Sequence, residues 1–141
     1  MLQRVTVSGF ICEKGKVLIL KRGEQETFLP GFWELPGGKL EFGEDPVQGV
    51  LREVKEEAGI DCQVVGIHHA WSAVDLYKGQ DTHFVEICFI LKMCPGQKVK
   101  IGSGMADSAW IKKAEIGNYK MSPEMQKEIL SGFKWVEDRA K

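Results

Sequence analysis

Three glutamates, Glu53, Glu56 and Glu57, lie three and four residues apart along the chain. In an α-helix, a rotation of about 100° per residue places them on one face, within about 100° of arc. Like charges at this spacing repel one another by about 0.2–0.5 kcal/mol per pair. Oxygen-rich clusters are what hard cations such as Mg²⁺ and Mn²⁺ bind. The pattern therefore indicates either a divalent-cation site or a solvated acidic helix face.

The charge around these glutamates favours the cation site. Residues 34–57 carry seven acidic and three basic side chains, a net charge of −4, although the whole chain has a net charge of −1. An acidic patch in an otherwise mildly basic chain suggests a bound cation more than an acidic partner. Arg52 stands beside the cluster and can hold a glutamate in place through two parallel hydrogen bonds.

The run from residue 38 to residue 60 reads GKLEFGEDPVQGVLREVKEEAGI. It resembles the Nudix (MutT-like) signature in its opening glycine, single glutamate, Arg-Glu and Glu-Glu pairs, and closing glycine with an aliphatic residue. The matching positions are Gly38, Glu44, Arg52, Glu53, Val54, Glu56, Glu57, Gly59 and Ile60. The resemblance implies a hydrolase of diphosphate bonds, dependent on Mg²⁺, with Mn²⁺ as an alternative.

The same resemblance implies roles for residues of this box. Metal ligands are expected from the Gly38 backbone and from Glu53, Glu56 and Glu57. One of these carboxylates, or a nearby acid, activates the water that attacks phosphorus, and Glu53 is the first candidate. A metal there neutralises diphosphate oxygens and lowers the pKa of bound water.

Two further residues, Glu44 and Arg52, complete the predicted catalytic set. We expect them to support the geometry of the loop and the helix rather than to touch substrate.

Three residues outside the glutamate cluster are predicted to bind substrate. Arg22 and Lys39 could contact phosphates, with an ordinary solvated charge as the alternative for each. Trp33 lies in FWELPGGKLE, which looks like the segment beside the pocket in nucleotide-cleaving members, and an aromatic ring there can stack on a base. Core packing is the alternative for Trp33.

The resemblance implies that the substrate is a nucleoside diphosphate linked to another moiety. We favour a nucleoside triphosphate, normal or oxidised, that is converted to the monophosphate and pyrophosphate. A dinucleoside polyphosphate or a nucleotide sugar remains an alternative, as does a non-catalytic nucleotide-binding module. Tyr77 lies where a tyrosine is associated with dinucleoside polyphosphate hydrolases, and Asp75 replaces the proline that goes with ADP-ribose members.

Glu86 is an unusual charge in an otherwise apolar strand. It could be a further metal ligand or base, or it could lie at an exposed edge, and we favour the exposed edge. The three histidines lack metal-site spacing and are expected to be strand residues.

One helix must position the glutamates. Asp45 is a typical N-cap, Pro46 fits the first helical position, and Gly59 is a typical C-terminal stop. Between them, apolar residues recur on the side opposite the glutamates. The pattern predicts a helix from residue 46 to residue 58 with one buried face.

The other elements are predicted from alternation and turn residues. A hairpin precedes the box, two strands surround a polar loop after it, and a short strand and a final helix follow. The predicted strands are 5–12, 17–20, 64–71, 83–91 and 109–111, the predicted loops are 23–43 and 75–81, and the final helix begins at Ser122-Pro123, with Met125, Ile129, Leu130, Phe133 and Val136 inward.

Length and composition limit the remaining choices. A chain of 141 residues is ordinarily one domain, and strands before and after a helix indicate an α/β or α+β sandwich. The resemblance narrows this expectation to an α/β fold, a Nudix-type α/β/α sandwich with a mixed sheet over residues 1–141. The four cysteines lack a CxxC pair and are expected to be free thiols in the cytoplasm.

The sequence also bears on partners. The longest apolar run, Ile87 to Leu91, is far shorter than the ~20 residues of a membrane span, so no membrane partner is expected. A net charge of −1 provides no basic field for a nucleic-acid polymer. The expected partner is a nucleotide small molecule, and a homodimer through the last helix or the first strands is left open.

Overall fold

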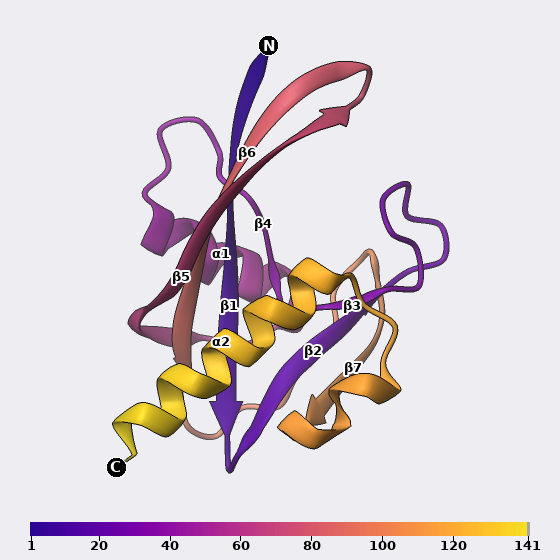
Figure 1. Cartoon of the computed structure of the whole chain (residues 1–141). Helices are drawn as coiled ribbons and strands as arrows, with labels where there is room; N and C mark the ends of the chain where they lie inside the picture. Colours follow the sequence, from indigo (N-terminus) through magenta and orange to yellow (C-terminus); the bar gives the residue numbers. More distant parts are fainter. Residues whose placement is uncertain (141) are drawn as a thin grey trace.

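A mixed sheet lies between two helices in the computed structural model, which describes residues 1–140 (Figure 1). Helix α2 (Pro123–Arg139) crosses the front of the sheet, and helix α1 (Pro46–Ala58) lies behind it. A short 3-10 helix, η1 (Lys113–Asn118), precedes α2. The strands are β1 (Leu2–Glu13), β2 (Lys16–Arg22), β3 (Trp33–Glu34), β4 (Gly37–Lys39), β5 (Cys62–Tyr77), β6 (Gln80–Met93) and β7 (Met105–Ile111).

The strand order places β1 and β6, which are far apart in the sequence, side by side. The main path of the sheet is β3-β2-β1-β6-β5, while β4 pairs with β1 and β7 pairs with β2. Strands β1 and β6 run parallel, and the other pairs are antiparallel. Strand β6 is therefore an interior strand, with a neighbour on each side.

Two hydrophobic clusters fill the spaces between the sheet and the helices. Val50, Val54 and Ala58 of α1 pack on one face of the sheet. Ile129 and Phe133 of α2 pack on the other face. These two cores confirm the predicted α/β/α sandwich with a mixed sheet.

The predicted polar loop at residues 75–81 is wrong. Strand β5 continues to Tyr77 and β6 begins at Gln80, so Lys78 and Gly79 form a two-residue turn with φ values of 50° and 79°. The end of this hairpin projects beyond the body of the molecule (Figure 1). Its polar residues therefore reflect exposure of a strand rather than the presence of a loop.

Three smaller expectations also need correction. The predicted loop at 23–43 contains the short strands β3 and β4, which form through pairing with β2 and β1. The last strand, β7, begins at Met105 instead of residue 109. Leu130 of α2 is 44% exposed and does not point into the core.

The four cysteines are free, as predicted. Within residues 1–140, no helix has both the length and the apolar character needed to cross a membrane. Lys141, the last residue of the predicted domain, lies outside the described residues.

Candidate active site

The glutamate-bearing helix begins and ends as its sequence predicts. The Asp45 side chain accepts a hydrogen bond from the backbone N–H of Val47 at 2.8 Å, and Pro46 occupies the first turn. Gly59 ends the helix with a left-handed φ of 69°, and its N–H bonds to the Lys55 carbonyl. These caps fix where the last two turns of α1, which carry the glutamates, meet the rest of the fold.

Arg52 organises the acidic groups around it. Its guanidinium donates to both oxygens of Glu44, at 2.7 and 2.9 Å, and to Oε1 of Glu53 at 2.9 Å. It also reaches Glu56 at 3.3 Å and the Lys39 carbonyl at 3.2 Å. The hydrogen bonds from Arg52 and from the backbone of Glu41 lower the pKa of Glu44 to about 2.

The glycine pair of β4 lies directly against two of the glutamates. The Gly37 N–H donates to Oε1 of Glu57 at 2.8 Å. A Cβ atom at Gly38 would lie 2.7 Å from the carboxyl carbon of Glu53. Only a residue without a side chain lets the backbone approach this carboxyl group so closely.

The three box glutamates differ in their surroundings. Glu56 is 57% exposed, whereas Glu53 is 14% exposed and Glu57 points toward Gly37. Their carboxyl oxygens do not all lie within 4.8 Å of one another in the part of the chain that the structure describes. The fold brings them to one end of α1, while Arg52 and Gly37 hold the carboxyl groups apart.

The groups around Glu53 and Glu57 fit a hard divalent cation. Burial raises the pKa of both carboxyls, that of Glu57 to about 8, and the neighbouring Glu34 adds to the effect at Glu57. A cation would compensate this poorly solvated negative charge. Carboxylate oxygens and a backbone carbonyl at Gly38 are the donors that Mg²⁺ and Mn²⁺ prefer.

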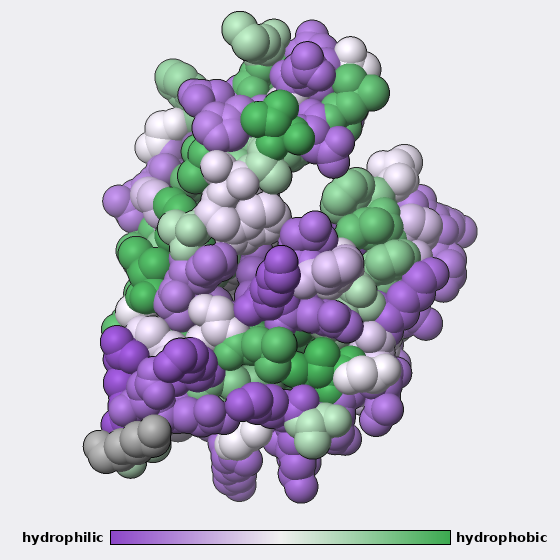
Figure 2. Space-filling view, viewed as in Figure 1, coloured by the Kyte–Doolittle hydropathy of each residue, from purple (hydrophilic) through white to green (hydrophobic). Residues whose placement is uncertain are grey.

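A cavity of about 630 Å³ opens next to β4. Figure 2 shows this face hollowed above α2, between the β5–β6 hairpin and the loop that joins β2 to β3. Of the predicted site residues, Arg22, Trp33, Gly38 and Lys39 line it. The carboxyl groups of Glu57 and Glu53 lie against β4 at the edge of the cavity, through their contacts with Gly37 and Gly38.

Two of the predicted substrate-binding residues already have protein partners. Arg22 forms an ion pair with Glu34 at 3.1 Å and donates to the Phe28 carbonyl at 2.6 Å. Trp33 packs edge-to-face on Tyr119, with ring centroids 5.0 Å apart. Both residues contribute to the cavity wall, and these contacts hold them in place.

One row of residues crosses the cavity floor from strand to strand. Thr6 of β1 pairs with Lys39 of β4 on one side and with Glu86 of β6 on the other, and Glu86 pairs with Trp71 of β5. All four residues line the cavity. With neighbouring strands about 4.8 Å apart, Glu86 lies about 10 Å across the sheet from Lys39.

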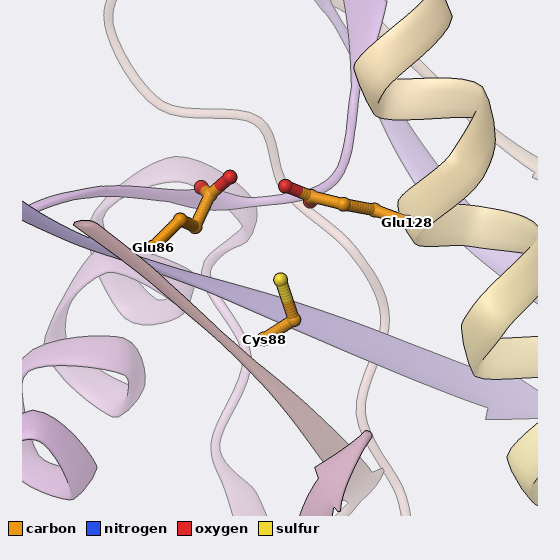
Figure 3. Close-up of side chains that lie close together, drawn as sticks. All are labelled: Glu86, Cys88 and Glu128. Carbon is orange, nitrogen blue, oxygen red and sulfur yellow. The ribbon is translucent and has the colours of Figure 1, made fainter. Parts of the chain in front are cut away.

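The favoured expectation that Glu86 lies at an exposed edge is wrong. Strand β6 is an interior strand, and the Glu86 carboxyl group faces that of Glu128 on α2 (Figure 3). Glu86 could be singled out from the sequence because it is a charged residue in an otherwise apolar strand. Glu128 was missed because a glutamate in a helix is ordinary, and nothing local to α2 indicates that it is 1% exposed.

Comparisons with known proteins agree with this fold. The model of the NUDIX domain matches residues 2–133. The 8-oxo-dGTP diphosphatase of Proteus vulgaris is 46% identical over 54 residues, which are 38% of this chain and 48% of that protein. The ADP-ribose pyrophosphatase of Methanocaldococcus jannaschii is 30% identical over 132 residues, 93% of this chain and 73% of that protein. The crystal structure of a MutT NUDIX hydrolase from Burkholderia pseudomallei matches with a TM-score of 0.78 at 21% identity, covering 92% of this chain and 97% of that one.

Proposed function

The chain belongs to the NUDIX family, and from this premise we propose that it is a Mg²⁺-dependent pyrophosphohydrolase of nucleoside triphosphates, normal or oxidised. Members of the family with named activities hydrolyse phosphoric anhydride bonds in nucleoside diphosphate derivatives. The products here would be the nucleoside monophosphate and pyrophosphate. We assign this activity to one domain over residues 1–141, with the Nudix box at 38–60.

The observation that carries the proposal is the contact of two poorly solvated carboxyls with the glycine pair at the edge of the cavity. Glu57 accepts from the Gly37 N–H, and Gly38 has room only for hydrogen beside Glu53. Mg²⁺ held by Glu53, Glu56, Glu57 and the Gly38 carbonyl would supply charge neutralisation at the diphosphate and a lowered pKa of bound water.

The remaining site residues have distinct roles in this proposal. One of the box carboxylates takes the proton of the attacking water, with Glu53 as the first candidate. Arg52 and Glu44 are positioning residues, since their mutual hydrogen bonds hold the loop against the helix. The exposed Lys39 contacts phosphate, while Arg22 and Trp33 form the wall against which the rest of the nucleotide lies.

A second candidate is the hydrolysis of a dinucleoside polyphosphate or nucleotide sugar. The Arg4 guanidinium lies 4.5 Å from the centroid of the Tyr77 ring, and Tyr77 packs edge-to-face on Phe84. All three residues line the cavity, so they offer a second stacking surface to a substrate with a second ring.

A substrate panel tests the proposal. Nucleoside triphosphates, 8-oxo-dGTP, ADP-ribose, a nucleotide sugar and a dinucleoside polyphosphate are each incubated with Mg²⁺, and the products are identified by chromatography. We expect monophosphate and pyrophosphate from triphosphates, and a loss of at least about 100-fold in turnover for Glu56→Gln and Glu57→Gln. Asp81→Asn, an exposed carboxylate at the hairpin end, is the control. Nucleotide binding without turnover would instead indicate a binding module.

A further inference from the structure

The cavity contains a second pair of carboxyl groups, which come from β6 and α2 and not from the Nudix box. Glu86 of β6 and Glu128 of α2 point toward one another above Cys88 (Figure 3). One carboxyl oxygen of each glutamate and the sulfur of Cys88 all lie within 4.8 Å of one another. Both glutamates line the cavity, and Glu86 lies two strands, about 10 Å, across the sheet from Lys39 of β4.

Hydrogen-bond donors from two other elements hold Glu128 in place. Its Oε1 accepts from Trp71 Nε1 of β5 at 2.8 Å, and its Oε2 accepts from the Ser8 hydroxyl of β1 at 3.3 Å. Among residues 1–140, no lysine, arginine or histidine forms an ion pair with Glu86 or Glu128. The negative charge of the pair is therefore compensated by dipoles and by a proton.

That proton belongs on Glu86. Two carboxylates this close and this poorly solvated cannot both be ionised. Burial, and then the facing Glu128, raise the pKa of Glu86 to about 9, a shift that the Thr6 hydroxyl partly offsets. Glu34 of β3, which lines the same cavity, acts in the same direction although it is paired with Arg22. At neutral pH Glu86 is thus a carboxylic acid.

The same three groups do not suit a metal ion. The oxygens of Glu128 already accept from Trp71 and Ser8, and burial raises the pKa of the Cys88 thiol, so the sulfur is protonated. Thiolate and carboxylate are the forms that bind metals.

We propose that Glu86 recognises the nucleobase of the substrate, accepting a hydrogen bond from an exocyclic amino group on one oxygen while its other oxygen holds a proton against Glu128. This inference rests on the nucleotide substrate proposed above. Trp33 and Phe32, from the other wall of the cavity, would stack on the same base. Glu86 then determines which bases bind and takes no part in the attack on phosphorus.

Binding of nucleoside monophosphates tests this recognition without metal or turnover. GMP is compared with inosine monophosphate, AMP with nebularine monophosphate, and CMP with zebularine monophosphate, because each pair differs by one amino group. Affinities are measured by calorimetry. In the wild type, at least one amino-bearing member should bind about tenfold more tightly than its partner, the worth of one buried hydrogen bond.

Two variants of Glu86 test whether its side-chain oxygen is the group that recognises the amino group of the base. Glu86→Gln can donate its amide to Glu128 and present its carbonyl to the base, so it should keep the tenfold preference. Glu86→Leu should lose the preference, with KM raised and kcat nearly unchanged. Asp81→Asn, on the same strand, is the control and should match the wild type.

The outcomes distinguish this inference from the proposed function. Nucleotide binding and hydrolysis with equal affinity for both members of every pair would overturn the role of Glu86 and leave the function intact. A preference that survives in Glu86→Leu, or a loss of more than 100-fold in turnover for Glu86→Gln, would also overturn it. If no nucleotide binds or is hydrolysed, both proposals fail.

Discussion

Arg52 and Glu44 are joined by two hydrogen bonds, from Nε to Oε2 at 2.7 Å and from Nη2 to Oε1 at 2.9 Å, across the junction of loop and helix. The same guanidinium donates to Glu53. One planar side chain therefore connects the loop that carries β4 with a predicted metal ligand, and a point charge cannot reproduce this geometry.

Arg52→Lys should consequently weaken metal binding although the charge is kept. Loss of a partner that orients a ligand typically costs about 10- to 100-fold in metal affinity. We expect at least a tenfold higher Kd for Mn²⁺, measured by electron paramagnetic resonance. Lys55→Arg on the same helix is the matched control. An equal Kd for both variants would show that the hydrogen bonds of the Arg52 guanidinium do not position Glu53.

Gly38→Ala should lower the activity of the protein without lowering its stability. The new Cβ would lie 2.7–2.8 Å from the Glu53 carboxyl atoms, which can move because they end a flexible side chain. We expect a melting temperature close to wild type and a loss of at least about 100-fold in kcat/KM. Gly117→Ala, where a Cβ meets nothing within 4 Å, should change neither quantity.

Gly37→Ala should behave differently from its neighbour. Here the new Cβ would meet the backbone carbonyl of Val7, which is fixed by the pairing of β4 with β1. Backbone cannot yield as a side chain can, so this variant should unfold at a clearly lower temperature, seen by calorimetry. A melting temperature equal to that of Gly38→Ala would contradict the register of β4.

Metal should stabilise the wild type and not Glu53→Gln. At ten times its Kd, Mg²⁺ stabilises a folded protein by about 1.4 kcal/mol, which for this size corresponds to a melting shift of roughly 3–6 °C. Burial raises the pKa of Glu53, so neutralising it should cost the metal-free protein little. Thermal melts with chelator and with Mg²⁺ decide this, and equal shifts in both proteins would remove Glu53 from the ligand set.

Stability should depend on pH through Glu86. Its pKa is raised to about 9 in the fold, from about 4.3 in an unfolded chain, so the folded state retains a proton that the unfolded state has lost. The free energy of unfolding should therefore decrease as pH rises from about 5 to 9, with a slope approaching about 1.4 kcal/mol per pH unit, the value for one proton.

Glu86→Gln isolates that contribution, because other raised groups, Glu57 among them, remain in both proteins. Urea unfolding of both from pH 5 to pH 9 should show a shallower decrease in the variant. Parallel curves would mean that Glu86 is ionised in the folded protein.

The elements that could be predicted are those determined by neighbouring residues. Helix α1 was predicted with its caps, because Asp45, Pro46 and Gly59 act within one turn of the helix ends. Helix α1 lies within the Nudix box, whose residues follow one another closely along the chain and could therefore be identified from the sequence.

What escaped prediction depends on partners far away in the sequence. Strand β4 consists of two glycines and a lysine and exists only through its pairing with Thr6, Val7 and Ser8. Glu86 and Glu128 are brought together by the packing of α2 on the sheet, and neither sequence segment contains information about the other. Polar residues at the end of the β5–β6 hairpin resembled a loop because both kinds of structure face solvent.

The parallel pairing of β1 with β6 has a consequence for how the protein is made. Residues 2–11 leave the ribosome well before their partners, residues 82–91. Long-range pairings of this kind form slowly, because a large loop must close before any contact is gained. Until β6 has been synthesised, β1 can pair only with β2 and β4, which leaves one edge of the strand open. The cavity floor, built from both strands, therefore forms late, and the nascent chain is most exposed to aggregation until residue 91 has emerged.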